Sequence, residues 1–505
     1  MIPLETFVNE YLATLSAGYF VRQYITVICL FAFGMVLSDC LSDRGASPLK
    51  RCALAYPLGL CAFSVTAYVM IVIGIPYNKW TVCTALALET AAAVFLNRKS
   101  YATYCFGVKR RLLLAVAVLA IAFIAVCGAA PVIISNDTMY YYRRYPDCIV
   151  YYGGLRDQFD YWLTDTGLGA VAADTLPALF GFRESFGIRE FFHINFIVYF
   201  GICIYEKAKE HIPGKGSVVA ALLITALLAT ATPFVILGHW GLANMYFMEL
   251  FFIAAYYTYD CGVNGFGASA LLITALALFR IEGTMFVVWL ILCLSLYSGL
   301  GKKLAGYVLV PVFILFGGYC LKIFTEFYVL DNIYTFLTPQ KAVALVGMIG
   351  FAAVYLLCIE PRLPKRLHDN LPWLYIAAEI LGNLVFLALD HERYIGNLKV
   401  FYANLFRQSG WGVFSYFAVM MALLFAVEYM ILYKSRKMAP DRSDAFNILL
   451  TAGFMLIVLA ASFGRGDLLA EDVGDSGNRV LLQTVPLIVM TFGELGIKLA
   501  GAWKE

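Results

Sequence analysis

Apolar runs long enough to cross a membrane recur along almost the whole 505-residue chain, and they limit its fold more than any other feature. An α-helix of about 20 apolar residues spans a bilayer. Hydropathy predicts about fifteen such helices, near residues 24–41, 53–76, 80–97, 112–134, 191–206, 217–236, 244–259, 266–280, 284–300, 304–325, 342–358, 373–390, 413–433, 445–463 and 480–500. Because lipid offers no hydrogen bonds, each segment has to satisfy its own backbone. We therefore expect an all-α polytopic membrane protein.

The composition excludes a soluble protein. Hydrophobic residues make up 62% of the chain and charged residues 14%, whereas soluble proteins average about 45–50% and about 25%. The net charge of +3 is too small to indicate a nucleic-acid partner. Most of the 13 cysteines lie within apolar runs, and the sequence has no CxxC pair and no Cys/His cluster. The cysteines are therefore expected to pack as small hydrophobic side chains.

The lysine and arginine residues predict the orientation. If the predicted spans alternate strictly, 22 of the 37 basic residues fall on one side and 14 on the other, and Lys322 lies within a span. Cytoplasmic loops carry the excess of positive charge. The richer side is therefore expected to be cytoplasmic, in a multi-pass protein of the cytoplasmic membrane without a soluble domain.

The longest polar segment, residues 135–190, falls on the opposite, outer side. It is rich in Tyr, Asp and Arg, and its aromatic content favours an ordered loop. Asp137 opens this loop directly after a predicted span, and Arg143, Arg144 and Asp147 follow. A carboxylate in that place can take a proton from a hydroxyl group or hold a cation beside a phosphate. An ordinary helix-end aspartate is the alternative.

Two further outer positions bring charges close to apolar runs. Arg280 and Glu282 lie between two predicted spans with almost no loop. A charge at membrane depth costs about 2.5–3.5 kcal/mol on insertion scales, so such residues usually pair or line a cavity. Arg479, preceded by Asn478, lies where the last predicted span begins, and its guanidinium group could clamp a phosphate. Side chains that reach to the interface are the alternative in both cases.

Other polar residues are weaker candidates. His391 and Glu392 follow a predicted span and His239 begins a short outer turn, but none of them has the spacing of a metal-ligand motif. A solvated helix end is the simpler interpretation of the first two. The acidic residues deep within apolar runs are Glu89, Glu249 and Glu379. We expect these to be satisfied structural acids or, alternatively, proton relays.

Three of these features together resemble the GT-C superfamily of polytopic glycosyltransferases, which use polyprenyl-phosphate-linked sugars at the outer face of the membrane. The outer loop with an acid close to the membrane reads PVIISNDTMYYYRRYPDC. The basic residue ahead of Glu-Gly at an outer hairpin reads FRIEG. The Asn-Arg pair ahead of apolar residues and a proline reads SGNRVLLQTVPL.

The resemblance implies transfer of a sugar from a polyprenyl-phosphate donor to a lipid-linked or cell-envelope glycan acceptor. It implies that Asp137 is the catalytic base or a metal-linked acid and Arg479 a phosphate or acceptor contact, while Arg280 and Glu282 line the same cavity. The further substrate contacts expected are Arg143, Arg144 and Asn478. Direct displacement with one base predicts inversion at the anomeric carbon.

By this resemblance the chain divides into extra N-terminal helices, residues 1–111, and a GT-C-like core, residues 112–500. Only one acid follows the span at 112–134 directly, where the family usually has a pair. Possible partners for it are Asp147, Asp157 and Asp160. The resemblance therefore implies no certain cofactor and leaves a divalent metal open.

The alternative is a lipid-linked oligosaccharide flippase or another secondary transporter. The acids within spans would then be coupling charges. Transporters commonly show internal repeats with broken helices at the midplane, and no repeat is visible in the sequence. Location separates the two functions. A transferase needs Asp137, Arg280 and Arg479 around one outer cavity, whereas a transporter needs its acids around a central one.

Overall fold

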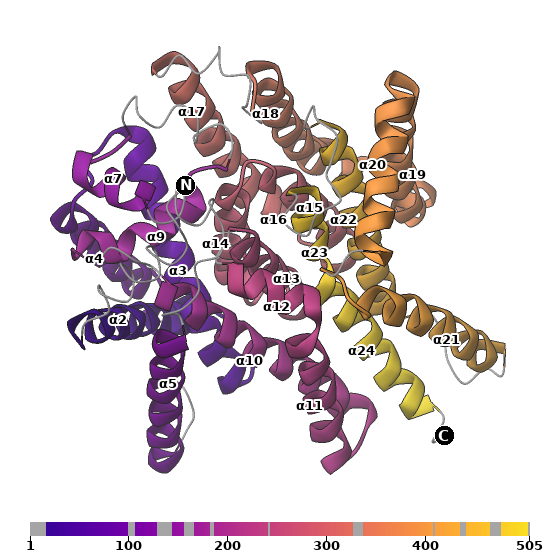
Figure 1. The fold of residues 1–505 in the computed structure, drawn as a ribbon, viewed down its shortest axis with the longest axis horizontal. Helices are drawn as coiled ribbons and strands as arrows, with labels where there is room; N and C mark the ends of the chain where they lie inside the picture. The colour runs from indigo at the N-terminus through magenta and orange to yellow at the C-terminus, as the bar shows by residue number, and fades with distance from the viewer. Residues whose placement is uncertain are drawn as a thin grey trace.

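The computed structural model describes residues 17–98, 107–128, 144–155, 166–181, 186–240, 243–326, 337–407, 410–434, 441–464 and 476–502. Every regular element in these ranges is a helix (Figure 1). Eleven of the described helical segments are long and apolar enough to cross a membrane, and a twelfth is added if two helices joined by a 63° bend count as one. The structure thus confirms the prediction of an all-α polytopic membrane protein.

The first four described helices are α2 (Ala17–Leu41), α3 (Pro48–Ile73), α4 (Lys79–Leu96) and α5 (Val108–Gly128). α3 begins after Ser47, whose hydroxyl oxygen accepts a hydrogen bond from the Lys50 N–H, and Pro48 opens its first turn. α2 crosses α3 at very short range, because a Cβ atom on Gly34 would lie 1.7 Å from the Ala55 carbonyl oxygen. Glycine at this crossing lets the two backbones touch.

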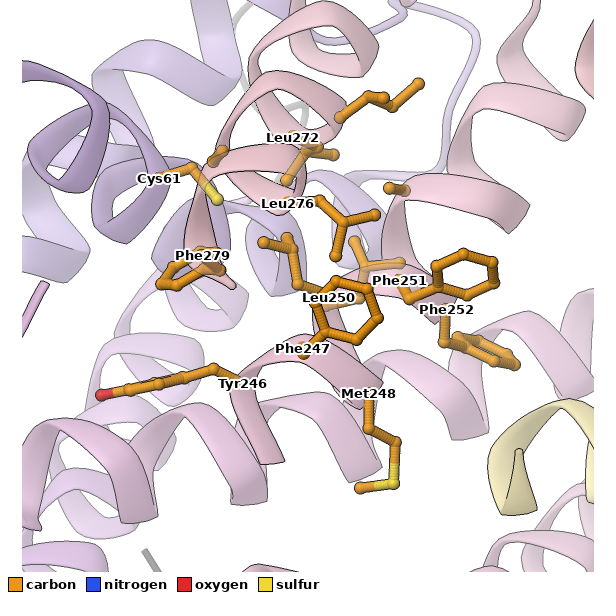
Figure 2. Packing of buried hydrophobic residues seen from close by; sticks show 14 of the residues in the cluster. Cys61, Tyr246, Phe247, Met248, Leu250, Phe251, Phe252, Leu272, Leu276 and Phe279 are labelled. Atoms are coloured by element: carbon orange, nitrogen blue, oxygen red, sulfur yellow. The ribbon is translucent and has the colours of Figure 1, made fainter. Parts of the chain in front are cut away.

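Four helices form the centre of the molecule: α10 (Phe186–His211), α13 (Ala243–Cys261), α14 (Phe266–Phe279) and α15 (Gly283–Ser298). α13 is buried along almost its whole length, and α10, α14 and α15 pack around it. Figure 2 shows Phe247, Leu250 and Phe251 of α13 beside Leu272 and Leu276 of α14. A helix that neighbouring helices enclose can also carry polar residues, because those helices supply partners.

α14 and α15 are too short to cross the whole hydrocarbon layer. With 14 and 16 residues, they are about 21 and 24 Å long, whereas the layer is about 30 Å thick. If their other ends lie at the inner edge, the turn that joins them ends about 6–9 Å below the outer edge. Arg280, Ile281 and Glu282 make up this turn.

Part of the predicted outer loop folds into the helix core. Its described helices are α7 (Tyr145–Tyr152) and α9 (Gly169–Leu179). α9 is buried at almost every position and packs against α3, α7 and α14. The contact with α14 is tight, since a Cβ atom on Gly169 would lie 2.3 Å from the Leu278 carbonyl oxygen. α9 therefore packs directly against the C-terminal end of α14.

The remaining described helices surround this centre. They are α11 (Lys215–Thr230), α12 (Thr232–Trp240), α16 (Gly301–Leu304), α17 (Val310–Glu326), α18 (Pro339–Val354), α19 (Lys365–Leu389), α20 (His391–Phe406), α21 (Phe414–Lys434), α22 (Arg442–Gly464), α23 (Ser476–Leu482) and α24 (Val485–Ala502), with π-helical turns at Ala305–Leu309 and Tyr355–Ile359 and a short 3-10 turn at Glu360–Arg362. In Figure 1, α4, α5, α19 and α21 lie at the periphery, while α12, α13 and α14 lie in the middle. α20 corresponds to no predicted span.

Among the described residues, the ion pairs that join helices distant in the sequence fall into two sets. One set contains Lys50, whose ammonium nitrogen lies 3.2 Å from Glu206 and 2.7 Å from Asp260, and Lys498, which lies 2.7 Å from Asp444. All of these residues belong to segments that alternation puts on the basic side. The second set, described below, joins segments of the other side. This grouping agrees with strict alternation, and which side faces the cytoplasm stays a prediction.

Candidate functional site

The first two turns of α13 connect three charged groups from other elements. The Asn244 side-chain oxygen accepts a hydrogen bond from Arg280, 2.8 Å away. The Tyr246 hydroxyl donates to Asp174 at 3.3 Å, and Glu249 is hydrogen bonded to the His193 ring. Because α13 is enclosed by other helices, these contacts lie inside the protein. We call this set of contacts the α13 polar cluster, and it comprises Asp174, Arg189, His193, Asn244, Tyr246, Glu249, Arg280 and Glu282.

The turn between α14 and α15 holds the Arg280 side chain in place. Arg280 adopts an extended conformation that ends α14, and the Gly283 N–H donates to its carbonyl oxygen at 3.0 Å. Its guanidinium group forms an ion pair with Glu282, and both side chains are about nine-tenths buried. Gly167 lies against this turn with a φ of +89°, and a Cβ atom there would be 3.0 Å from the Ile281 nitrogen. The outer loop therefore closes directly over the turn.

A second ion pair, between α9 and α10, is buried more completely than the first. The Asp174 and Arg189 side chains are 0% and 2% exposed, and Arg189 Nε donates to Asp174 Oδ1 at 3.2 Å. The Arg189 guanidinium carbon also lies 5.4 Å from the centre of the Tyr246 ring. The Tyr56 hydroxyl donates to the Ile188 carbonyl oxygen at 3.0 Å and fixes α10 beside α3. Sequence reasoning missed this pair, although an acid in the otherwise apolar run GAVAADTLPALF was a signal.

His193 and Glu249 form a third contact, between α10 and α13. The Glu249 side chain is completely buried, and the His193 side chain is 13% exposed. The His193 ring stacks on Phe234 of α12 with 4.8 Å between the ring centres. A Cβ atom on Gly238 would lie 2.6 Å from His193 Nε2, so glycine at this position leaves room for the ring. The predicted buried acid Glu249 therefore has a histidine partner.

The predicted residues Asn478 and Arg479 lie on α23. Asn478 is fully buried and accepts a hydrogen bond from Trp411 Nε1 at 2.9 Å, whereas Arg479 is partly exposed. α23 packs against α12, α20 and α22, and α12 packs in turn against α13. α12 therefore lies between α23 and α13. The neighbour of Arg479 is held by Trp411, which sequence reasoning did not single out.

Several predicted residues lie apart from this cluster. Arg144 is exposed at the start of α7, and Asp147 is partly buried in its first turn. His391 and Glu392 are exposed in the first turn of α20. Asp390 caps this helix by accepting a hydrogen bond from the Arg393 N–H at 3.0 Å, as a solvated helix start requires.

The structure does not describe the side chains of the remaining predicted residues. Those outside the described residues are Asp137, Arg143, Asp157 and Asp160. His239 lies near the end of α12, and its side chain is outside the described part. Among the described residues, no group of three or more His, Cys, Asp or Glu side chains could hold a metal ion.

The predicted acids within other spans, Glu89 and Glu379, lie away from the α13 polar cluster. Glu89 of α4 accepts hydrogen bonds from the Thr66 hydroxyl with both oxygens, at 2.7 and 2.9 Å. Glu379 lies on α19, one of the peripheral helices. Neither joins the α13 polar cluster through a contact between described residues.

The α13 polar cluster combines two arginines, three carboxyl groups, one histidine, one amide and one phenol. Fixed arginines can stabilise negative charge that develops on a substrate. A carboxyl group beside an imidazole can accept and pass on a proton. Comparisons of the chain with family models, with curated protein sequences and with solved structures give no match.

Proposed function

We propose that the chain is a membrane glycosyltransferase that moves a sugar from a polyprenyl-phosphate donor to a lipid-linked or cell-envelope glycan on the outer side. The observation that carries the proposal is the Arg280 turn. The short apolar helices α14 and α15 meet at a turn that presents an arginine, which Asn244 and Glu282 hold in place. Burying ionisable residues inside a membrane protein is unfavourable, so such residues mark a candidate functional site.

The reaction requires few groups. A hydroxyl oxygen of the acceptor attacks the anomeric carbon, the bond from that carbon to the phosphate oxygen breaks, and the bonding electrons leave with the polyprenyl phosphate. Arg479 and Arg280 would stabilise the charge that grows on the leaving group. Asp137 would take the proton of the attacking hydroxyl group. Attack from the opposite face inverts the anomeric carbon.

The distribution of acids supports a transferase over a transporter. The transporter interpretation assigns coupling roles to Glu89, Glu249 and Glu379. Glu89 is satisfied by Thr66 of the neighbouring helix, and Glu379 lies on a helix that is mostly exposed along its length. Only Glu249 belongs to the enclosed centre. The three acids therefore do not surround one shared path.

The proposal is tested with purified protein in lipid nanodiscs and a panel of synthetic polyprenyl-phosphate sugars. We expect release of polyprenyl phosphate and transfer of the sugar to a glycan acceptor with at least one donor. Arg280→Gln should reduce turnover about 100-fold or more, as loss of one preorganised donor does in other enzymes. Arg407→Ala is the matched control, because this arginine is exposed and predicted to be outer.

A second measurement guards against misfolding of the Arg280 variant. Structures of the protein with bound polyprenyl phosphate should show the phosphate within hydrogen-bond reach of Arg479. Absence of transfer with every donor, together with phosphate bound away from Arg479 and Arg280, would refute the proposal. Transport of lipid-linked sugar by the same preparation would then favour the flippase.

A further inference from the structure

The hydrogen-bonding capacity of Glu249 is only half used. Its Oε1 atom is hydrogen bonded to His193 Nδ1, but its Oε2 atom is buried and has no hydrogen-bond partner among the described residues. Buried polar atoms in native proteins are almost always paired, so each exception needs an explanation. A carboxyl oxygen that takes up and releases a proton provides one.

Among the described residues, the charges next to the pair come from α10 and α13. α13 contributes Glu249 itself, and α10 contributes Glu190, three residues before His193, which acts electrostatically on both partners. From α12, Phe234 and Gly238 bring no charge to the ring. Arg189, on the same helix, is paired with Asp174. The imidazole is therefore hydrogen bonded to one carboxyl group, Glu249, and a second acid, Glu190, lies one turn away on α10. Negative charge beside an imidazole favours its protonated form, so this place can hold a proton.

The pair is also placed beside the candidate substrate site. Glu249 follows Tyr246 by three residues, and residues at this spacing are neighbours on a helix surface. Tyr246 is bonded to Asp174, and Asn244 at the start of the same helix is bonded to Arg280. The distance along α13 from the Arg280 contact to Glu249 is five residues, or about 7.5 Å.

We propose that His193 and Glu249 form a proton-binding pair that receives the proton lost by the acceptor hydroxyl group. The role rests on the proposed function. When the hydroxyl oxygen forms its bond to the anomeric carbon, its proton leaves by way of the base and is held on the imidazole or carboxyl group until it returns to the outer solution. His193 and Glu249 are positioning residues for this proton and do not contact the sugar.

The first experiment does not depend on activity. The chain has only five histidines, so isotope-labelled imidazole signals can be resolved by NMR and the His193 signal assigned with His193→Asn. We expect His193 to change protonation between pH 5 and 9, and Glu249→Gln to change its proton affinity tenfold or more. Glu89→Gln, which alters an acid that is already satisfied, should leave the His193 titration unchanged. A His193 signal that keeps one protonation state throughout would overturn the proposal.

The second experiment uses turnover. With an active donor, Glu249→Gln and His193→Asn should change the pH profile of turnover and leave the KM for the donor within about twofold of wild type. A pair that only joins α10 to α13 would lower thermal stability and leave the profile shape unchanged, and this result would overturn the proposal. If every donor fails but the His193 titration responds to Glu249→Gln, the proposed function fails and the proton-binding pair stands.

Discussion

Separating Asp174 from Arg189 tests whether the loop helix α9 is part of the folded core. Both side chains are almost completely buried. Arg189→Met removes the counter-ion of a buried carboxylate, and breaking a buried pair in this way lowers the free energy of unfolding by about 3–5 kcal/mol. The variant can avoid a buried unpaired charge by protonating Asp174. With an ordinary pKa of about 3.9, protonation at pH 7 costs about 4 kcal/mol, and this cost is the upper limit of the loss.

The two single variants should differ in their pH dependence. In Arg189→Met the upper limit falls to about 1.5 kcal/mol at pH 5, because protonation of Asp174 becomes easier as the pH falls. Asp174→Asn leaves a buried guanidinium group, which does not lose its proton, so its loss of stability should be the same at pH 5 and pH 7. The double variant removes both charges and should recover at least half of the loss.

The assay is reversible unfolding in mixed micelles at pH 5 and pH 7, with the free energy of unfolding obtained from each transition. Lys322→Met is the control, since its ion pair with Glu326 is half exposed at the glutamate and is worth less than about 1 kcal/mol. The reasoning is refuted if both single variants are as stable as the control. It is also refuted if the double variant is the least stable of the three.

Two further predictions concern packing and charge. Gly34→Ala puts a Cβ atom 1.7 Å from the Ala55 carbonyl oxygen, so we expect a loss of about 2 kcal/mol or more, while Gly347→Ala, which has open space around it, should unfold at the wild-type temperature. Burial opposes ionisation of Asp441, but the Lys498 ammonium group outweighs it and lowers the pKa of this carboxyl group from 3.8 to about 2. This stabilisation is complete above pH 4 and is lost as the pH falls to 2, so the deficit of Lys498→Met in melting temperature should be largest above pH 4 and shrink below it.

The positions of the helices could be predicted because lipid enforces a simple rule. A backbone in hydrocarbon must bond to itself, so each long apolar run becomes a helix. This rule does not predict the helices α9 and α20. α9 has only 11 residues within a polar loop, and its burial depends on packing against α3, α7 and α14. α20 is too polar to resemble a span, and it buries one face, with Tyr394, Asn397 and Phe401, against its neighbours.

The candidate site could be predicted only where a single residue stands out in its local sequence. Arg280 and Glu282 interrupt a long apolar stretch, and their ion pair follows from their spacing. The link from Arg280 to Asn244 joins residues 36 positions apart, and the link from Asp174 to Tyr246 joins residues 72 apart. Such contacts depend on which helix faces pack together, and hydropathy carries no information about that.

The depth of the two predicted phosphate contacts assigns them different roles. Arg479 lies at the predicted outer end of the last helical segment, three residues after α23 begins, whereas α14 and α15, if their other ends lie at the inner edge, leave Arg280 about 6–9 Å below the outer edge. A lipid phosphate at headgroup level meets Arg479 first, so Arg479→Ala should weaken binding of polyprenyl phosphate about tenfold or more, the loss of one strong charge-assisted contact. Arg280→Gln should leave that affinity within about threefold and reduce turnover instead. Equilibrium binding to nanodiscs, measured beside single-turnover rates, separates the two effects, and equal losses of affinity in both variants would contradict the assignment.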